Sequence, residues 1–256
     1  MSSSPIVFDI ETGGLDDETL VTLAPEFIPP PAPGEFNPAS VKVGNIKDQD
    51  KINAKIQEAR DAHAAAVAIH PKVIEEARAS HLAEFRSKAA LSPLTGRVLA
   101  IGFRSDKGFL IEDGGGDEPE LLERFWQTYA KCRANAGGPR QMVGWNILLF
   151  DLPFLIRRSW FHEIVVPQAA FDGRAFDPLF IDLMPRFTPG GWREFVKLDT
   201  AAKFFKCGAK LDGVNGEDFA RLWLSGNAEE KQRAICYLEN DLEMTRGVAM
   251  RMGIAA

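Results

Sequence analysis

Two carboxylates near the N-terminus are the first residues whose types and spacing could do chemistry. Asp9 and Glu11 lie two residues apart in the segment FDIETGGL. Side chains at positions i and i+2 of a strand leave the same face, so both carboxylates point to one side. A divalent cation relieves their repulsion, because hard cations prefer oxygen ligands. For this short pattern alone, the alternative is two solvated acids at a strand end.

A third carboxylate, Asp151, lies in the segment GWNILLFDLPFL, where a loop turns into an apolar helix. Asn146 could order this loop through its side chain. Phe150 would ordinarily belong to the core, but an aromatic ring near a cleft could also stack on a nucleobase, a contact worth roughly 1–3 kcal/mol. Taken alone, Asp151 also fits a simple helix cap, with Pro153 in the first turn.

The third group of residues lies near the C-terminus, in the segment ICYLENDLEMT. A helix is predicted over 228–252, opened by Asn227 as its cap. Tyr237 and Asp241 are four residues apart, so they share one face of this helix. The alternative is an exposed acid beside a half-buried tyrosine.

The elements that must position these residues follow from apolar runs and turn signals. Three strands come first, and helices and strands then alternate, which predicts an α/β domain with a mixed sheet. The strands are expected at 5–10, 97–103, 108–113, 141–146 and 180–184. The helices are expected from Asp117 to about 131 and at 152–161, 198–206, 217–225 and 228–252.

One segment does not fit this alternation. The proline-rich stretch PPPAPG at 29–34 is followed by strong helix formers over 48–90. Pro71 is expected to separate two helices, because proline suits a first helical turn better than an interior. We therefore predict a helical hairpin at 29–93, inserted in a single domain that spans 1–256. It either covers a surface or acts as a lid, a strand guide or a partner-docking arm.

Composition narrows the class of protein. The formal charge of −6 and the pI of about 5.4 argue against a large basic face that coats nucleic acid. The three cysteines form no CxxC pair, which argues against a disulfide framework or a zinc site. No apolar run reaches the length of a membrane span, and the N-terminus lacks a signal-peptide pattern. A cytoplasmic protein is expected.

Together, the three clusters resemble the motifs of the DEDD superfamily of 3′→5′ exonucleases. Asp9-Ile10-Glu11-Thr12 resembles its D-x-E-T pattern, and Asn146 through Phe150-Asp151 resembles its N-x-x-x-F-D pattern. Tyr237 and Asp241 resemble the Y-x-x-x-D pattern of the tyrosine subclass. The histidine subclass carries its histidine five residues before the last acid, where this chain has Cys236.

The second motif and the stretch at 197–216 are similar to the proofreading exonuclease domains of family-B DNA polymerases. The resemblance covers roughly 1–28 and 94–252 and includes no polymerase. It implies a ribonuclease-H-like fold, in which a five-stranded mixed sheet flanked by helices has its first three strands antiparallel.

The resemblance also implies a set of roles for the site residues. Two divalent cations, Mg²⁺ or Mn²⁺, suit a purely carboxylate site. Asp9 is implied to bridge both cations, Glu11 and Asp241 to complete one site, and Asp151 to help hold the other through water. Tyr237 is implied to orient the attacking water. The implied substrate-binding residues are Thr12, Leu15, Asn146 and Phe150.

The function that follows is removal of nucleoside 5′-monophosphates from the 3′ end of single-stranded DNA, in replication or repair. A protein partner from either process is expected, and no membrane. One alternative is an RNA-trimming exonuclease. Another is a catalytically silent subunit that binds nucleic acid or a polymerase. Four further acids compete for a place in the site: Asp172, Asp177, Asp182 and Asp199.

Overall fold

The computed structural model describes residues 4–190, 194–211 and 216–254. The chain divides into two compact units. The first comprises Met1–Asp16 and Lys88–Ala256, and the second is Asp17–Ser87. Part of the stretch at 197–216, namely 212–215, lies outside the described residues.

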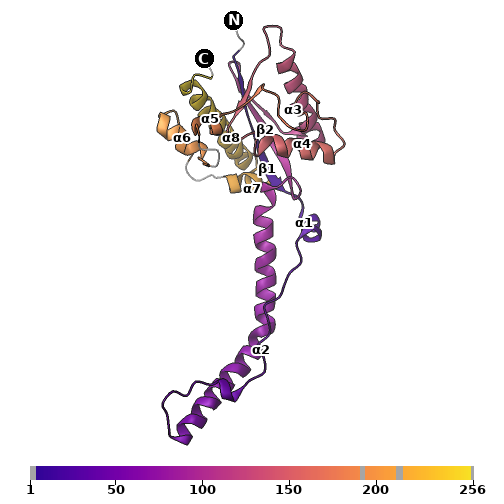
Figure 1. Ribbon diagram of the computed structural model, residues 1–256. Coiled ribbons are helices and arrows are strands. Elements are labelled where there is room, and N and C mark those ends of the chain that lie inside the picture. The colour runs from indigo at the N-terminus through magenta and orange to yellow at the C-terminus, as the bar shows by residue number, and fades with distance from the viewer. Residues whose placement is uncertain (1–3, 191–193, 212–215, 255–256) are drawn as a thin grey trace. The chain divides into compact units, whose positions relative to one another are not determined.

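The first unit is built on a five-stranded sheet with the order β3-β2-β1-β4-β5. Figure 1 shows this unit, with β1 and β2 labelled among its helices. β1 pairs antiparallel with β2, and β2 antiparallel with β3. β1 pairs parallel with β4, and β4 parallel with β5. The mixed sheet predicted from the sequence, with its first three strands antiparallel, is therefore confirmed. The strands are β1 (Ile6–Gly14), β2 (Gly96–Ser105), β3 (Gly108–Glu112), β4 (Met142–Gly144) and β5 (Phe180–Asp182).

Helices cover both faces of this sheet, and a buried apolar cluster lies under each. Phe8, Ile10 and Ile101 contribute to the cluster with α3 (Glu118–Arg133) and α4 (Asp151–Phe161). Val7 and Val143 contribute to the cluster with α6 (Leu198–Phe205), α7 (Gly216–Leu224) and α8 (Ala228–Arg251). The side chains of β1 therefore alternate between two cores. The short helices of this unit are α5 (Leu183–Phe187) and the 3₁₀ turns Ala89–Leu91 and Gly114–Gly116.

The predicted boundaries differ from the observed ones mainly at β1. The predicted strand ended at residue 10, but β1 continues to Gly14 because its pairing with β2 continues. The register shifts between Glu11 and Thr12, which face Ala100 and Val98 in turn. Such a bulge bends a strand and re-aims its side chains, and bulges are frequent beside active sites.

The start of α8 agrees with the sequence prediction. The side chain of Asn227 accepts hydrogen bonds from the backbone N–H groups of Glu229 and Glu230. Asp117 stands at the N-cap position of α3, as predicted, but its side chain makes no capping hydrogen bond there.

The second unit corrects the prediction of two helices separated at Pro71. A single helix, α2 (Gln49–Lys88), runs through the proline and is accompanied by α1 (Asp17–Leu23) and a 3₁₀ turn at Pro38–Ser40. Proline removes one backbone hydrogen bond from a helix interior. The alanine- and glutamate-rich flanks favour the helix on both sides, and side-chain contacts on both sides of Pro71 hold the helix to an extended segment.

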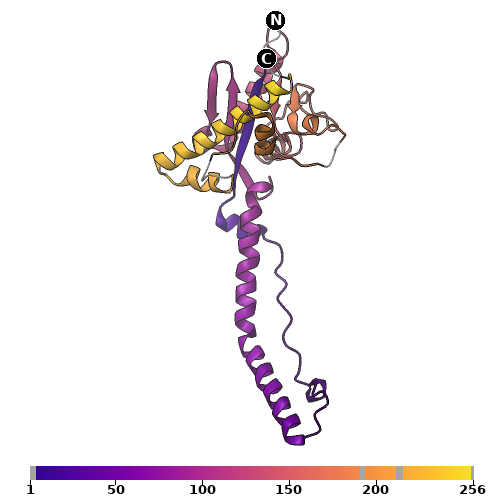
Figure 2. The ribbon, with the colours of Figure 1, turned by 90° about the vertical axis from the view of Figure 1, so that its left-hand side faces the viewer.

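This extended segment, residues 25–36, lies along α2 (Figure 2), and three histidines of α2 contact its carbonyl oxygens. The spacing of the histidines along α2 matches the spacing of their acceptors. His70 and His81 are separated by a rise of about 16 Å in a helix, and Pro25 and Pro30 by about 15 Å in a polyproline chain. The Nε2-to-oxygen distances are 2.6 Å for His63 to Gly34, 3.2 and 3.1 Å for His70 to Pro30 and Pro31, and 3.2 Å for His81 to Pro25.

Aromatic contacts reinforce this pairing. The ring of Phe27 lies 5.7 Å from that of His81, and the ring of Phe36 lies 5.6 Å from that of His63. Arg78 lies over Phe27 and Arg60 over Phe36. The second unit is thus held by repeated side-chain contacts along α2, which has no fully buried residue among those described.

We predict that replacing His63, His70 and His81 together by leucine frees the extended segment from α2. The variant loses hydrogen bonds worth about 1 kcal/mol each, so we expect chymotrypsin to cleave after Phe27 and Phe36 at least about tenfold faster. Limited proteolysis with mass spectrometry measures this. Lys72→Leu, at an exposed position of α2, is the matched control. Equal cleavage of the triple variant and the wild type would contradict the assigned role of the histidines.

Candidate active site

The alternation of side chains along β1 places the first two carboxylates of the site. Phe8 and Ile10 face the core formed with α3 and α4. Asp9 and Glu11, in alternate positions, lie on the face covered by α8, where they approach Asp241. The two-residue spacing thus delivers both carboxylates to one face, as the sequence predicts.

Close packing of α8 against β2 depends on a glycine. Gly102 lies directly opposite Asp9 in the antiparallel pair. A Cβ atom at Gly102 would stand 2.7 Å from Leu242 Cδ1 and 2.9 Å from Leu238 Cγ, closer than real Cβ contacts. Only glycine therefore lets the Leu238–Leu242 turn of α8 lie against the sheet at this level.

This turn of α8 supplies Asp241 and follows directly on Tyr237, and both side chains are buried. One oxygen each of Asp9, Glu11 and Asp241 lie within 4.8 Å of one another. Opposite oxygen ligands of Mg²⁺ are separated by about 4.2 Å, so this cluster has nearly the span that one divalent cation needs. The buried Oδ1 atom of Asp241 has no hydrogen-bond partner among the described residues. An all-oxygen donor set with an unpartnered buried atom fits a hard cation.

Asp151 has a different environment. It is the first residue of α4, and its Oδ1 accepts a hydrogen bond from the backbone N–H of Ile10 at 3.2 Å. It therefore lies beside β1 just beyond the point where the pairing of β1 with β4 ends. It does not belong to the close cluster, but its charge raises the pKa values of both Asp9 and Glu11.

The electrostatics of the site disfavour negative charge without a cation. Burial, followed by the charges of Asp151, Glu11 and Asp241, raises the pKa of Asp9 well above its usual range. Burial and the charge of Asp241 raise the pKa of Glu11 in the same way. Burial also raises the pKa of Asp241, and it raises that of Asp151 to about 7. Metal-free carboxylates here tend to keep their protons.

Lys210 is a site residue that the sequence analysis missed. Its Nζ donates a hydrogen bond to the Tyr237 hydroxyl at 2.7 Å and lies 3.8 Å from Asp241 Oδ2. Its positive charge lowers the pKa values of Glu11 and Asp9, against the other causes. The stretch at 197–216 was noted for its resemblance, but no spacing rule connects a lysine there to acids at the N-terminus.

The four substrate-binding residues implied by the resemblance lie on two segments. On β1 and just after it, the Thr12 hydroxyl donates to the carbonyl of Ala90 at 2.7 Å, and Leu15 is half-buried. On the loop between β4 and α4, Phe150 is half-buried and packs against the core. Asn146 adopts a left-handed backbone conformation, with φ of 61°.

Asn146 orders its loop differently from the prediction. Its carbonyl oxygen, rather than its side chain, accepts hydrogen bonds from the N–H groups of Leu149 and Phe150. The buried Oδ1 of Asn146 has no partner among the described residues. A left-handed asparagine with an unpartnered oxygen costs energy unless a ligand uses it.

The acids that compete for the site have other partners. Asp182 accepts hydrogen bonds from the backbone N–H groups of Asn146, Leu148 and Met184, so it anchors the loop. Asp177 bonds to Tyr129 and Arg133, and Asp172 accepts from two N–H groups of a turn. Asp199 accepts from Lys203 and from the backbone of Lys210.

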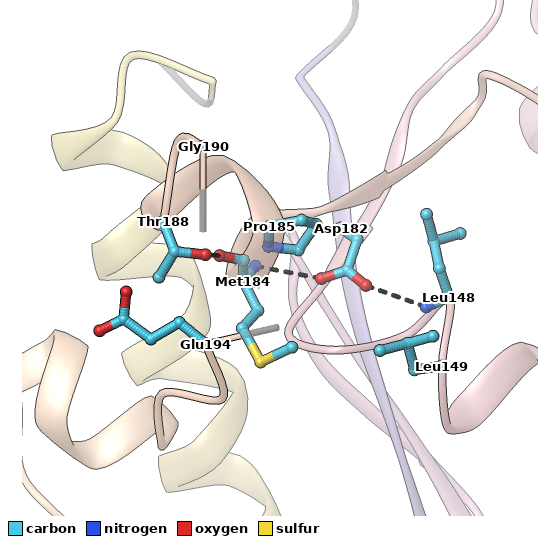
Figure 3. A pocket seen from close by; sticks show the side chains of 8 residues that line it. All are labelled: Leu148, Leu149, Asp182, Met184, Pro185, Thr188, Gly190 and Glu194. Carbon is cyan, nitrogen blue, oxygen red and sulfur yellow. Dashed lines mark hydrogen bonds between the residues drawn. The ribbon is translucent and has the colours of Figure 1, made fainter. Parts of the chain in front are cut away.

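A cavity of about 340 Å³ lies beside the loop that carries Asn146 (Figure 3). Its walls are mostly apolar, and its acids are the buried Asp182 and the exposed Glu194. Because Asp182 is occupied by backbone donors, the cavity is better suited to a flat apolar group than to a cation. It is lined by Leu148, Leu149, Asp182, Met184, Pro185, Thr188, Gly190 and Glu194.

No helix among the described residues is long and apolar enough to cross a membrane. A search of curated proteins found no match to the chain. Among solved structures, the chain is similar to the family B DNA polymerase from the hyperthermophilic archaeon Pyrobaculum calidifontis. The TM-score is 0.52 at 18% sequence identity, and the match covers 65% of this chain but 23% of the polymerase chain. This likeness confirms the ribonuclease-H-like fold.

A family model matches residues 97–252, which is more than half of the chain. That range includes Asp151, Lys210, Tyr237 and Asp241, and the sheet joins it to Asp9 and Glu11 on β1. The family is described as a predicted 3′-5′ exonuclease related to the exonuclease domain of PolB. The chain belongs to this family of predicted 3′-5′ exonucleases.

Proposed function

We propose that this protein is a metal-dependent 3′→5′ exonuclease of the tyrosine subclass that trims single-stranded DNA. The observation that carries the proposal is the cluster of half-buried Asp9 and Glu11 with buried Asp241, which lies beside Tyr237 and Lys210. A structural protein gains nothing from three clustered carboxylates, since their mutual repulsion and burial destabilise the fold without a cation.

The carboxylates are proposed to hold two divalent cations, Mg²⁺ or Mn²⁺. Bound cations supply an activated water and offset the negative charge on the leaving 3′ oxygen. Asp9 would contribute to both cation positions, Glu11 and Asp241 would complete one, and Asp151 would support the other. Asp151 lies outside the group of three, but its charge acts on Asp9 more strongly than that of Glu11 or Asp241, which supports a place for it beside Asp9.

Tyr237 is proposed to orient the attacking water rather than to remove its proton. Burial, followed by the charge of Asp241, raises the pKa of Tyr237 far above its usual range, so its hydroxyl stays protonated at neutral pH. Lys210 donates to the tyrosine oxygen, and the tyrosine hydroxyl in turn donates to the carboxylate of Asp241. These two contacts fix the hydroxyl at the edge of the carboxylate cluster, from which it would orient the water.

The substrate end is proposed to lie between two segments. Thr12 and Leu15 face the terminal nucleotide, while the unpartnered Oδ1 of Asn146 accepts a hydrogen bond from it. Phe150 borders the same loop, and the apolar cavity next to it has room for a nucleobase upstream. DNA is proposed over RNA because of the resemblance to the polymerase family. Single strands of both kinds should be compared directly.

The second unit is proposed to dock on a replication or repair protein. Residues 17–87 carry 11 acidic and eight basic side chains. The unit therefore has no excess of positive charge that would favour binding to phosphate. The family is related to the exonuclease domain of PolB, so the partner we expect is a polymerase whose products this chain would proofread.

The proposed activity predicts the effect of a single amide substitution. Asp9→Asn keeps the shape of the side chain but removes one charge from the cation cluster, so we expect cleavage to slow at least about a hundredfold. The assay follows shortening of a 5′-labelled single-stranded DNA and a matched RNA with Mg²⁺, Mn²⁺ or chelator. Asp172→Asn, which changes an acid in a distant turn, should keep full activity. A wild-type protein that shortens neither strand in either metal would overturn the proposal.

The raised pKa values predict how stability depends on pH. The native metal-free site binds more protons than the unfolded chain between about pH 4 and the pKa of about 7 of Asp151. Its contribution to the free energy of unfolding therefore falls as pH rises through this window. Mg²⁺ should reverse the loss and raise the melting temperature more at pH 8 than at pH 6.

Differential scanning calorimetry of the wild type and Asp151→Asn, in chelator and in Mg²⁺, measures this effect. The Asn variant cannot titrate at this position, so its melting temperature should fall less between pH 6 and pH 8. A wild-type protein whose stability in chelator rises over the same range would show that the site carboxylates are already ionised.

Lys210 is predicted to assist the reaction without holding the cations. Lys210→Met should lower kcat about tenfold at saturating Mg²⁺, because Tyr237 loses the donor that fixes its hydroxyl. Binding of Mn²⁺ should not weaken, since the variant removes a positive charge beside the cation cluster. Steady-state kinetics and calorimetric Mn²⁺ titration separate the two effects, with Lys107→Met, at an exposed lysine of the β2–β3 turn, as control. Weaker Mn²⁺ binding in Lys210→Met would contradict this role.

A further inference from the structure

We infer that Asp199 is a positioning residue that, together with Asn240, holds Lys210 against Tyr237. The inference rests on the proposed function, because it concerns how that site is assembled. Neither residue makes a hydrogen bond to the carboxylate cluster in the described part of the chain, although the charge of Asp199 contributes to the raised pKa of Asp241. Both act on the backbone of the segment Cys207–Lys210, which follows α6 and carries Lys210 at its end.

Asp199 fixes the backbone of Lys210 itself. Its Oδ1 accepts a hydrogen bond from the Lys210 N–H at 2.8 Å, although the two residues are 11 positions apart. Its Oδ2 accepts from the ammonium of Lys203 at 2.7 Å, so both carboxylate oxygens are engaged. The Lys203 hydrogen bond also lowers the pKa of Asp199, a carboxyl group that is charged at neutral pH in any case.

Asn240 fixes the preceding residue from the other side. Its Nδ2 donates to the carbonyl of Ala209 at 3.2 Å. Asn240 belongs to α8, one residue before Asp241 and three after Tyr237. The helix that supplies two site residues therefore also sets the position of the lysine that approaches them.

Close contacts hold the rest of this segment on α8. A Cβ atom at Gly247 would stand 2.9 Å from Cys207 Cβ, and one at Gly208 would stand 2.8 Å from Met244 Cγ. The Cys207 N–H donates to the carbonyl of Ala202 at 3.0 Å, which ties the segment back to α6. The segment therefore has contacts to both helices, and Asp199 and Asn240 provide them at its Lys210 end.

The physical reason for such tethers is the length of the lysine side chain. Its ammonium stands four methylene groups from the backbone and can take many positions unless its Cα is fixed. A charged group aids a reaction most when it is held in place beforehand. An acid in the first turn of α6 could serve the helix alone, but then its removal would affect stability and not the lysine.

The experiment is a double-mutant cycle on the full chain, with Asp199→Ala, Lys210→Met and the pair of both. We expect Asp199→Ala to lower kcat about fivefold with KM unchanged, and to lower it no further in the Lys210→Met background. Asp199→Asn, which can still accept the backbone N–H, should retain most of the activity. Losses that multiply in the pair, or a full kcat in Asp199→Ala, would overturn the inference.

A second readout does not depend on catalysis. Lys210 held by Tyr237 should react slowly with an acetylating reagent, and Asp199→Ala should raise its acetylation rate at least threefold by mass spectrometry. Lys203→Met is the control, because it removes the other partner of Asp199 and leaves the backbone bond in place. An unchanged rate at Lys210 overturns the inference even if the wild type is active.

An inactive wild type with the expected change in labelling would instead overturn the proposed function and leave the positioning role intact. If Asp199→Ala fails to fold by calorimetry, Asn240→Ala tests the same idea from α8. It should show the same lack of additivity with Lys210→Met and the same rise in Lys210 acetylation. Additive losses or an unchanged rate in Asn240→Ala count against the inference in the same way.

Discussion

The close approach of α8 to the sheet is the constraint on which the rest of the site depends. Gly102 stands opposite Asp9 and leaves room for Leu238 and Leu242 where any Cβ atom would collide with them. Between those two leucines, the same turn carries Asp241 toward the acids of β1. Asp9, Glu11 and Asp241 come within ligand distance of one cation only because a residue that contributes no side chain sits beneath the helix.

This close approach brings several carboxylates together, and the positive charges of the protein offset their repulsion only in part. Burial raises the pKa values of all four acids, and repulsion from the other site acids adds to this for Asp9 and Glu11. Lys210 opposes the rise for Asp9, Glu11 and Asp241. The lysine is itself partly exposed and lies 3.8 Å from Asp241, so it does not neutralise the cluster. A site whose negative charge is not offset within the protein is stabilised when cations bind to it. Destabilised sites of this kind are expected where function requires them.

The sequence predicts those parts of the site that follow from local periodicity. The two-residue spacing of Asp9 and Glu11 and the four-residue spacing of Tyr237 and Asp241 each fix a shared face, and the strand order fixes the mixed sheet. Sequence could not predict Lys210 or the role of Gly102, because both depend on contacts between distant segments. The prediction of two helices separated at Pro71 was wrong for a related reason. The extended segment that supports α2 on both sides of the proline comes from residues 25–36. The role of Asp182 as the anchor of the Asn146 loop was likewise visible only in the fold.

The two units are separable in physical terms, because each is held together by its own contacts. Gly14 pairs with Gly96, and the Leu15 N–H donates to the carbonyl of Thr95, so the sheet unit closes its own strand ends around the inserted residues. The inserted unit has its own contacts between α2 and the extended segment. Closing a loop costs little more when the loop is long, so the sheet tolerates an insertion that folds on itself. The sequence of the insertion can thus vary while the pairing of β1 with β2 keeps Asp9 and Glu11 in register.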